Sequence, residues 1–153
     1  IFMVIFNKNG VTENNHVLFS EKSSNEKKKT HIFSFNHLIE NKNKIKKFPF
    51  GIQINSDQHL EISKKDLKNI DLVQFNFLHF KDGRPFTLVK ILRRELNFKK
   101  EIRASGNILP DQIIFLFRVG FDTVEINEKN RENCFKILEM DTGLYYQRKA
   151  NLT

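Results

Sequence analysis

Arginine is concentrated in one part of this chain, although lysine is the usual basic residue elsewhere. All seven arginines lie between residues 84 and 148, and five of them lie between residues 84 and 118. The planar guanidinium group can hold a carboxylate, phosphate or sulfate through two parallel hydrogen bonds, which the ammonium group of lysine cannot do. This bias therefore indicates positions that either bind an anion or brace the fold.

Two segments near these arginines, Asp82-Gly83-Arg84 and Ser105-Gly106-Asn107, each follow an expected strand and precede an expected helix. In parallel α/β sheets such loops form the ligand crevice, and a helix N-terminus there offers free N–H groups to an anion. With Arg84 and Arg103 beside them, these loops predict a small site for phosphate, sulfate, sulfite or carboxylate. The candidate ligand-binding residues are Asp82, Gly83, Arg84, Arg103, Ser105, Gly106, Asp111 and Gln112.

The same residues also permit a purely structural interpretation. Asp82-Gly83 is an ordinary turn pair, in which Asp82 would cap the following helix. Arg103 lies inside an expected strand, where a buried arginine without a partner would cost roughly 3–5 kcal/mol. Asp82 or Asp111 is the expected partner in that case.

The first fifty residues predict a small β-hairpin and a basic linker that pack on the main domain. Residues 2–6 and 16–19 are rich in β-branched and aromatic residues, and Asn9-Gly10 between them is a strong turn signal. Residues 32–39 could form a short helix or a strand, and residues 42–47 form a charged connector. Nine lysines stand against four acidic residues in this region, which gives it a net charge of +5.

Residues 51–141 predict a domain of about four β-α units, followed by a flexible tail over residues 142–153. Such alternation implies parallel strands joined by right-handed crossovers. An open doubly wound sheet is the first choice, and a half-barrel of β-α units is the alternative. The expected strands are residues 51–54, 72–77, 101–105 and 123–126, and the expected helices are residues 62–69, a segment after Pro85, a segment from Pro110 to Gly120, and residues 128–140.

Several kinds of chemistry have no motif in this sequence. The five histidines show no HxH or HExxH spacing, and the single cysteine, Cys134, cannot form a thiolate metal site. No dinucleotide fingerprint, P-loop or nucleophile elbow is present. We therefore expect no metal and no cofactor, and the catalytic residues, if the protein is an enzyme, stay unknown.

Composition and hydropathy indicate the cellular compartment of the protein and the kinds of partner that are not expected. A single cysteine fits a reducing compartment, and no segment approaches eighteen apolar residues, so we expect a cytoplasmic protein with no membrane partner. Much of the positive charge lies in residues 27–29 and 42–47, within polar sequence typical of a solvated loop. Nucleic acid is therefore not an expected partner, while self-association stays open.

The signature residues of the second half resemble those of a bacterial family, domain of unknown function 934 (DUF934). The segments that carry the resemblance are Phe80-x-Asp82-Gly83-Arg84, Leu92-Arg93, Glu101-x-Arg103-Ala104-x-Gly106, Asp111-Gln112 and Gly120-Phe121-Asp122. Family members are labelled as oxidoreductases involved in sulfite reduction, a label that reflects gene neighbourhood. The resemblance implies an accessory protein of assimilatory sulfur metabolism, non-catalytic or a partner of a sulfite or nitrite reductase. The alternatives are an enzyme or binding module for a small anion, and a structural protein that dimerises.

Overall fold

The computed structural model describes residues 2–18, 30–40, 49–58 and 62–142. Within these ranges eight strands form one sheet, in the order β2-β1-β8-β7-β6-β5-β4-β3. Strands β3 to β8 are parallel, whereas β1 is antiparallel to both β2 and β8. The strands are β1 (Met3–Asn7), β2 (Gly10–Thr12), β3 (His16–Leu18), β4 (Thr30–Ser34), β5 (Phe50–Asn55), β6 (Ile70–Phe77), β7 (Glu101–Gly106) and β8 (Thr123–Asn127).

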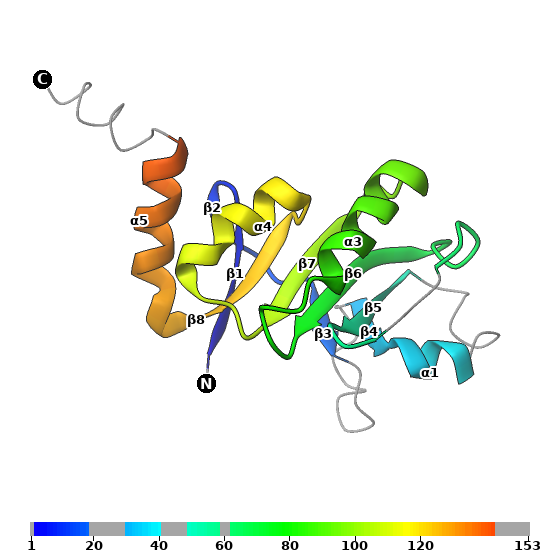
Figure 1. Cartoon of the computed structure of the whole chain (residues 1–153). Coiled ribbons are helices and arrows are strands. Elements are labelled where there is room, and N and C mark those ends of the chain that lie inside the picture. Colours follow the sequence, from blue (N-terminus) through cyan, green and yellow to red (C-terminus); the bar gives the residue numbers. More distant parts are fainter. Residues whose placement is uncertain (1, 19–29, 41–48, 59–61, 143–153) are drawn as a thin grey trace, which may run out of the picture.

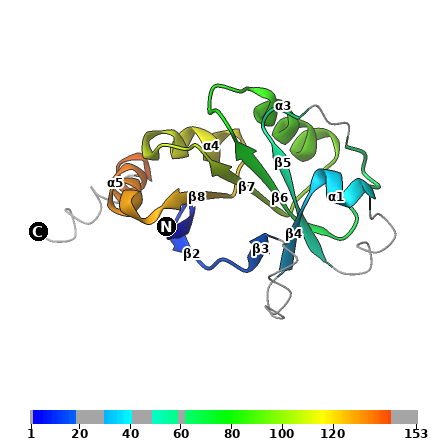
Figure 2. The ribbon, with the colours of Figure 1, turned by 90° about the horizontal axis from the view of Figure 1, so that it is seen from below.

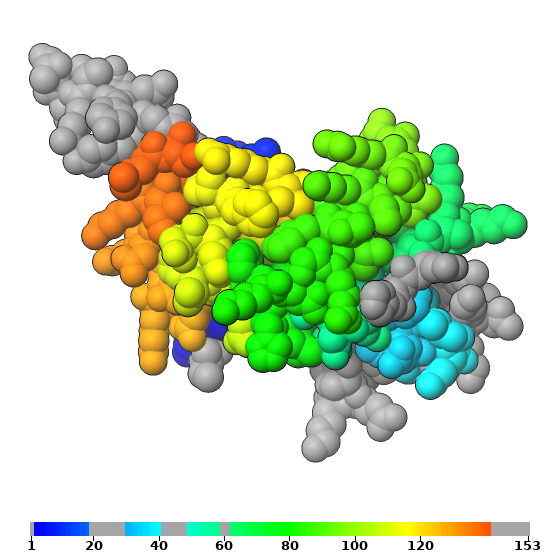
Figure 3. Space-filling model, in the orientation of Figure 1, coloured from blue at the N-terminus to red at the C-terminus, as the bar shows by residue number. Residues whose placement is uncertain are grey.

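The described helices all cover one face of this sheet (Figure 1). Their buried side chains share one core cluster with the strand residues that point toward them, and the side chains of α3, α4 and α5 fill much of the face seen in Figure 3. The helical elements are α1 (Phe35–Glu40), α3 (Arg84–Lys90) with the π-helical turn η1 (Ile91–Glu95), η2 (Pro110–Gln112) leading into α4 (Ile113–Val119), and η3 (Glu128–Asn130) leading into α5 (Arg131–Thr142).

This arrangement corrects the first choice of sheet, the open doubly wound one, and supports the half-barrel. Parallel strands β3 to β8 stand side by side in chain order, so every right-handed crossover turns the same way and delivers its helix to the same face. A doubly wound sheet needs a point at which the strand order reverses, and the order here has none among its parallel strands. The sheet is also larger than the four β-α units expected.

The curl of the sheet follows from a short connection between its two outer strands. Residues 13–15 join β2 to β3, which form opposite edges, and this connection spans at most about 14 Å. A flat sheet of eight strands would separate its edges by about 34 Å. The sheet therefore bends into an arch with the connection across its open side (Figure 2).

The structure confirms the first strand of the predicted N-terminal hairpin, but the predicted second strand does not pair with it. Asn7 of β1 pairs with Gly10 of β2, so the turn forms at Lys8-Asn9. Residues 16–18 instead form β3 and pair in parallel with β4. Residues 32–39 divide between β4 and α1, so both interpretations of this segment hold in part. The charged connector at residues 42–47 lies outside the described residues.

Most elements of residues 51–141 form close to where the sequence predicts them. The exception is the helix expected at residues 62–69, where the chain makes successive turns instead. The capping pair does form, since Ser63 donates to Asp66 from both its backbone N and its hydroxyl, each at 2.9 Å. Asn69, with a positive φ of 67°, then directs the chain into β6 before a helix can develop.

None of the helices in the described part of the chain combines the length and the apolar character that crossing a membrane requires.

Candidate functional site

An open cleft lies where the carboxyl ends of β6 and β7 meet, as expected for a ligand crevice in a parallel sheet. Its volume is about 830 Å³. The lining side chains are a mixture of apolar, polar and basic groups and include no carboxylate. They belong to His79, Phe80, Lys81, Asn107, Ile108, Leu109 and Gln112, and Gly106 contributes backbone.

Gly106 holds the two loops of this cleft together. Its φ is +95°, and a Cβ at this position would lie 2.4 Å from the carbonyl oxygen of Phe77. Asn107 donates from its backbone N to the same carbonyl at 2.9 Å and from Nδ2 to the Leu78 carbonyl at 2.6 Å. Only glycine fits this contact without displacing the backbone.

Asp82, Gly83 and Arg84 form a loop brace rather than part of the cleft lining. Asp82 Oδ1 accepts a hydrogen bond from the Arg84 backbone N at 3.2 Å, as an Asx turn does, and lies 3.5 Å from Arg84 Nε. The Arg84 guanidinium also donates to the Asp57 carbonyl, which links the loops after β5 and β6. Gly83 is the exposed residue between the two partners.

Arg103 is buried, with 1% of its side chain exposed. Because its neighbours Ile102 and Ala104 pack in the core beneath the helices, strand alternation places Arg103 on the opposite face of the sheet. Its guanidinium donates to Glu101 Oε1 at 3.1 Å, Asn14 Oδ1 at 3.1 Å and Thr123 Oγ1 at 3.4 Å. The partner is thus Glu101, and neither Asp82 nor Asp111 fills that role. Neither Arg84 nor Arg103 lines the cleft, and their guanidinium groups share no partner among the contacts of the described residues.

The remaining predicted residues divide between the cleft and its surroundings. Gln112 lines the cleft, and its Oε1 accepts from the Leu109 backbone N at 2.8 Å. Asp111 is exposed in the first turn of η2. Ser105 is buried and its hydroxyl donates to the Phe75 carbonyl at 3.5 Å, so it stabilises the sheet.

Arg103 belongs to a polar row that crosses the inner, concave face of the sheet. The register aligns Gln53, Gln74, Arg103 and Thr123 on neighbouring strands, and Gln74 Nε2 donates to Gln53 Oε1 at 2.7 Å. Sequence reasoning missed this row, although glutamines inside two apolar strands were a signal that one face of the sheet is polar.

Two ionisable groups at this row have shifted pKa values. Burial lowers the pKa of His16, an effect that Arg103 reinforces and Glu101 opposes. Burial also raises the pKa of Glu125, although Arg103 draws it back toward the ordinary range. Desolvation is therefore the dominant influence on both groups.

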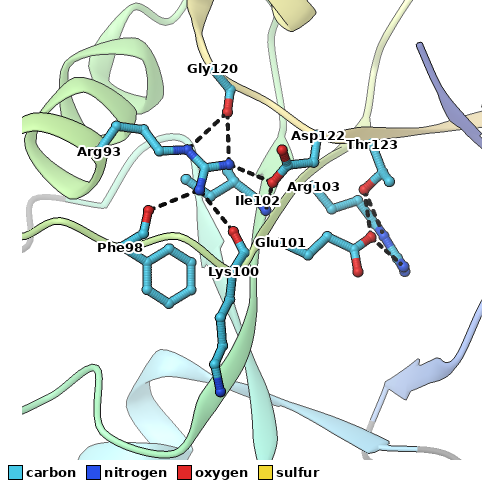
Figure 4. Close-up of polar contacts among 9 residues, drawn as sticks. All are labelled: Arg93, Phe98, Lys100, Glu101, Ile102, Arg103, Gly120, Asp122 and Thr123. Carbon is cyan, nitrogen blue, oxygen red and sulfur yellow. Dashed lines mark hydrogen bonds and ion pairs between the residues drawn. The ribbon is translucent and has the colours of Figure 1, made fainter.

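A second brace, centred on Arg93, joins the amino ends of β7 and β8 (Figure 4). The guanidinium donates to the carbonyls of Phe98 at 2.9 Å and Lys100 at 2.8 Å, to that of Gly120 at 3.0 and 3.2 Å, and to Asp122. Asp122 in turn accepts from the Ile102 backbone N at 2.9 Å. Arg93 and Asp122 were not among the candidate ligand-binding residues, and their contacts here are structural.

Cys134 is buried in α5, and burial raises the pKa of its thiol to about 11. A thiol with this pKa stays protonated near neutral pH, so it behaves as a small core residue. Within the described ranges, no three His, Cys, Asp or Glu side chains gather in a way that could hold a metal ion.

Comparison with known proteins identifies one family. The model of a family described as "Bacterial protein of unknown function (DUF934)" matches residues 51–153. No curated protein and no solved structure matches the chain.

Proposed function

The chain belongs to the DUF934 family, and from that premise we propose that it is an accessory protein of assimilatory sulfur metabolism. In this proposal it binds a sulfite or nitrite reductase and does not itself catalyse the reduction. The assignment to sulfur metabolism rests on the resemblance to this family. The observation that carries the binding role is the open cleft of about 830 Å³ at the carboxyl ends of β6 and β7.

The cleft has the composition of a protein-binding surface. Leu109, which lines the cleft, is 60% exposed, and Leu78 beside the cleft is 38% exposed. The polar side chains of Lys81 and Asn107 line the same cleft. Apolar side chains combined with polar ones are typical of protein interfaces, and clustered exposed apolar residues mark interaction sites.

Most charged residues of the family signature are held in ion pairs, which favours binding over catalysis. Arg93 pairs with Asp122, and Arg103 pairs with Glu101. Arg84 lies against Asp82. Groups held in such pairs are poorly placed to act as a general base or a nucleophile, which must reach a substrate.

A deletion combined with affinity capture tests this proposal. We expect loss of the gene in its natural host to slow growth on sulfate and not on cysteine, and the tagged protein to capture a reductase subunit. Leu109→Asp should lose that subunit, because a carboxylate would replace an exposed apolar side chain of the cleft. Leu18→Asp is the matched control, since Leu18 is 52% exposed on β3, away from the cleft. Normal growth of the deletion strain together with capture of no reductase subunit would refute the proposal.

A second candidate function, binding of a small anion, is supported by the charge of the same cleft. Lys81 and His79 line it without any carboxylate among the lining residues. These groups would take the role that the sequence pattern suggested for Arg84 and Arg103. We expect sulfite, sulfate or phosphate to raise the melting temperature of the native protein but not of Lys81→Gln. The absence of a shift with all three anions would exclude this candidate.

A further inference from the structure

A separate cavity of about 410 Å³ lies at the opposite, amino ends of β6 and β7. One wall comes from the turns before β6, and the other comes from the loop between η1 and β7. The lining residues are Lys64, Leu67, Lys68, Ile70, Leu96, Asn97, Phe98, Lys99 and Lys100. This volume lies within the range of about 300–1,000 Å³ that is typical of small-molecule sites.

The rim of this cavity carries an excess of positive charge. Its lining includes four lysines and no acidic residue. Lys100 Nζ lies 2.6 Å from Asp71 Oδ1, which compensates one of the four charges. Lys64, Lys68 and Lys99 are exposed, and the structure shows no ion pair for them within the residues it describes. Like charges around one concavity concentrate the local positive potential and attract a multiply charged anion.

The fold holds both walls of the cavity in place. Arg93 fixes the loop that carries Lys99, because its Nη1 donates to the carbonyls of Phe98 at 2.9 Å and Lys100 at 2.8 Å. The opposite wall is closed by a hydrogen bond of 3.2 Å from the Ile70 backbone N to the Leu67 carbonyl. A ligand therefore meets a preformed site, which lowers the ordering cost of binding.

The floor of the cavity distinguishes among anions. We use this term for the apolar lining residues, which are the half-buried Leu67 and Leu96 and the buried Ile70 and Phe98. A simple polyanion would use the lysines and leave this floor in contact with water, whereas a ligand with an apolar ring would cover it. We propose that this cavity binds a small organic polyphosphate of the nucleoside diphosphate kind, with phosphates on the lysines and the ring on the apolar floor.

Calorimetric titration with ADP at low salt tests the site on the full chain. We expect ADP to bind the native protein, and the triple variant Lys64→Gln, Lys68→Gln, Lys99→Gln to bind it at least about tenfold more weakly, which equals 1.4 kcal/mol. The control triple Lys90→Gln, Lys129→Gln, Lys136→Gln removes the same charge from exposed positions outside the cavity. It should keep the native affinity within about twofold. Equal melting temperatures of the three proteins without ligand establish that all are folded.

Two further probes separate the proposal from its competitors. Leu96→Ser should weaken the binding of ADP and leave inorganic triphosphate unchanged, because only ADP uses the apolar floor. Three results would overturn the proposal: no heat with ADP at millimolar concentration, equal weakening in both triple variants, or a short single-stranded oligonucleotide that binds the same lysines more tightly than ADP. The last result would assign the surface to nucleic acid. Each of these outcomes is independent of the carboxyl-end cleft and hence of the proposed function.

Discussion

At the scale of single residues, the arginines of the family signature bind oxygen atoms of the protein itself. Arg93 offers its donors to three carbonyl oxygens and to Asp122. One side chain thus ties its own turn to the loop before β7 and to the more distant loop before β8. The planar guanidinium group suits this task, because its N–H donors point in several fixed directions within one plane. The ammonium group of lysine cannot donate to all of these carbonyls at once. The guanidinium geometry suggested anion binding from the sequence, but in the structure it binds oxygen atoms of the protein itself.

Replacing Arg93 by lysine should therefore destabilise the protein although the charge is kept. We expect the free energy of unfolding to fall by about 2–4 kcal/mol, because several carbonyls and Asp122 lose a charged donor. Urea denaturation measures this change. The neighbouring Arg94 is exposed, and Arg94→Lys should stay within about 0.5 kcal/mol of the native protein. Similar effects of the two substitutions would show that Arg93 is not a brace.

His16 should make the protein sensitive to mild acid. Burial lowers its pKa below the ordinary 6.5, so the unfolded state binds a proton more readily than the native state. The stability that this group contributes is present above pH 6.5 and is lost as the pH falls through the folded pKa. His16→Gln should flatten this part of the pH profile of the urea midpoint, whereas His79→Gln, at an exposed position, should leave it unchanged. A profile unaffected by His16→Gln would contradict the assignment.

At the scale of elements, periodicity and turn chemistry predict most of the second half of the chain. Pro85 and Pro110 lie at the helix starts that the sequence predicts, and Gly120, with φ of +132°, ends α4. The failures come from short segments, where local preference decides little. Residues 62–69 carry a helix-capping pair but make only successive turns. Residues 16–18 are β-rich but pair with β4, the next strand along the chain, and not with β1.

The loop after β7 allows a test of the close contact between Gly106 and the Phe77 carbonyl, which joins the two loops of the cleft. Gly106→Ala should lower the free energy of unfolding by about 1–3 kcal/mol, because alanine at positive φ is strained and its Cβ would press on the Phe77 carbonyl. Gly83→Ala is the matched control, since Gly83 has φ of −85° and a Cβ added there would meet no atom within 4 Å. That variant should be neutral or gain about 0.4–1 kcal/mol. Thermal unfolding compares the two, and equal losses would mean that the close contact at Gly106 is not formed.

At the scale of the whole molecule, strand order and curvature could not be predicted from local pattern. Both a doubly wound sheet and a half-barrel are built from the same β-α units, and the choice between them depends on which strands become neighbours. The connection over residues 13–15 and the polar row on the concave face are what distinguish this sheet. The row could be foreseen in part, since alternation set Arg103 apart from Ile102 and Ala104, but its partners Asn14 and Thr123 come from other elements.

Asn14 should hold the connection over residues 13–15 against the sheet. Its Oδ1 accepts from Arg103 Nη1 and from the His16 backbone N, each at 3.1 Å. Asn14→Ala removes that acceptor and leaves a donor of the buried Arg103 unpaired, so the free energy of unfolding should fall by about 1–3 kcal/mol. Asn15→Ala is the control, because Asn15 contributes its backbone carbonyl to Thr30 at 3.0 Å and keeps it in the variant. Hydrogen exchange should accelerate at β3 and at β7 in Asn14→Ala alone, since this tie joins the start of β3 to the middle of β7. Unchanged exchange in both variants would show that the half-barrel keeps its curvature without the hydrogen bond between Arg103 and Asn14.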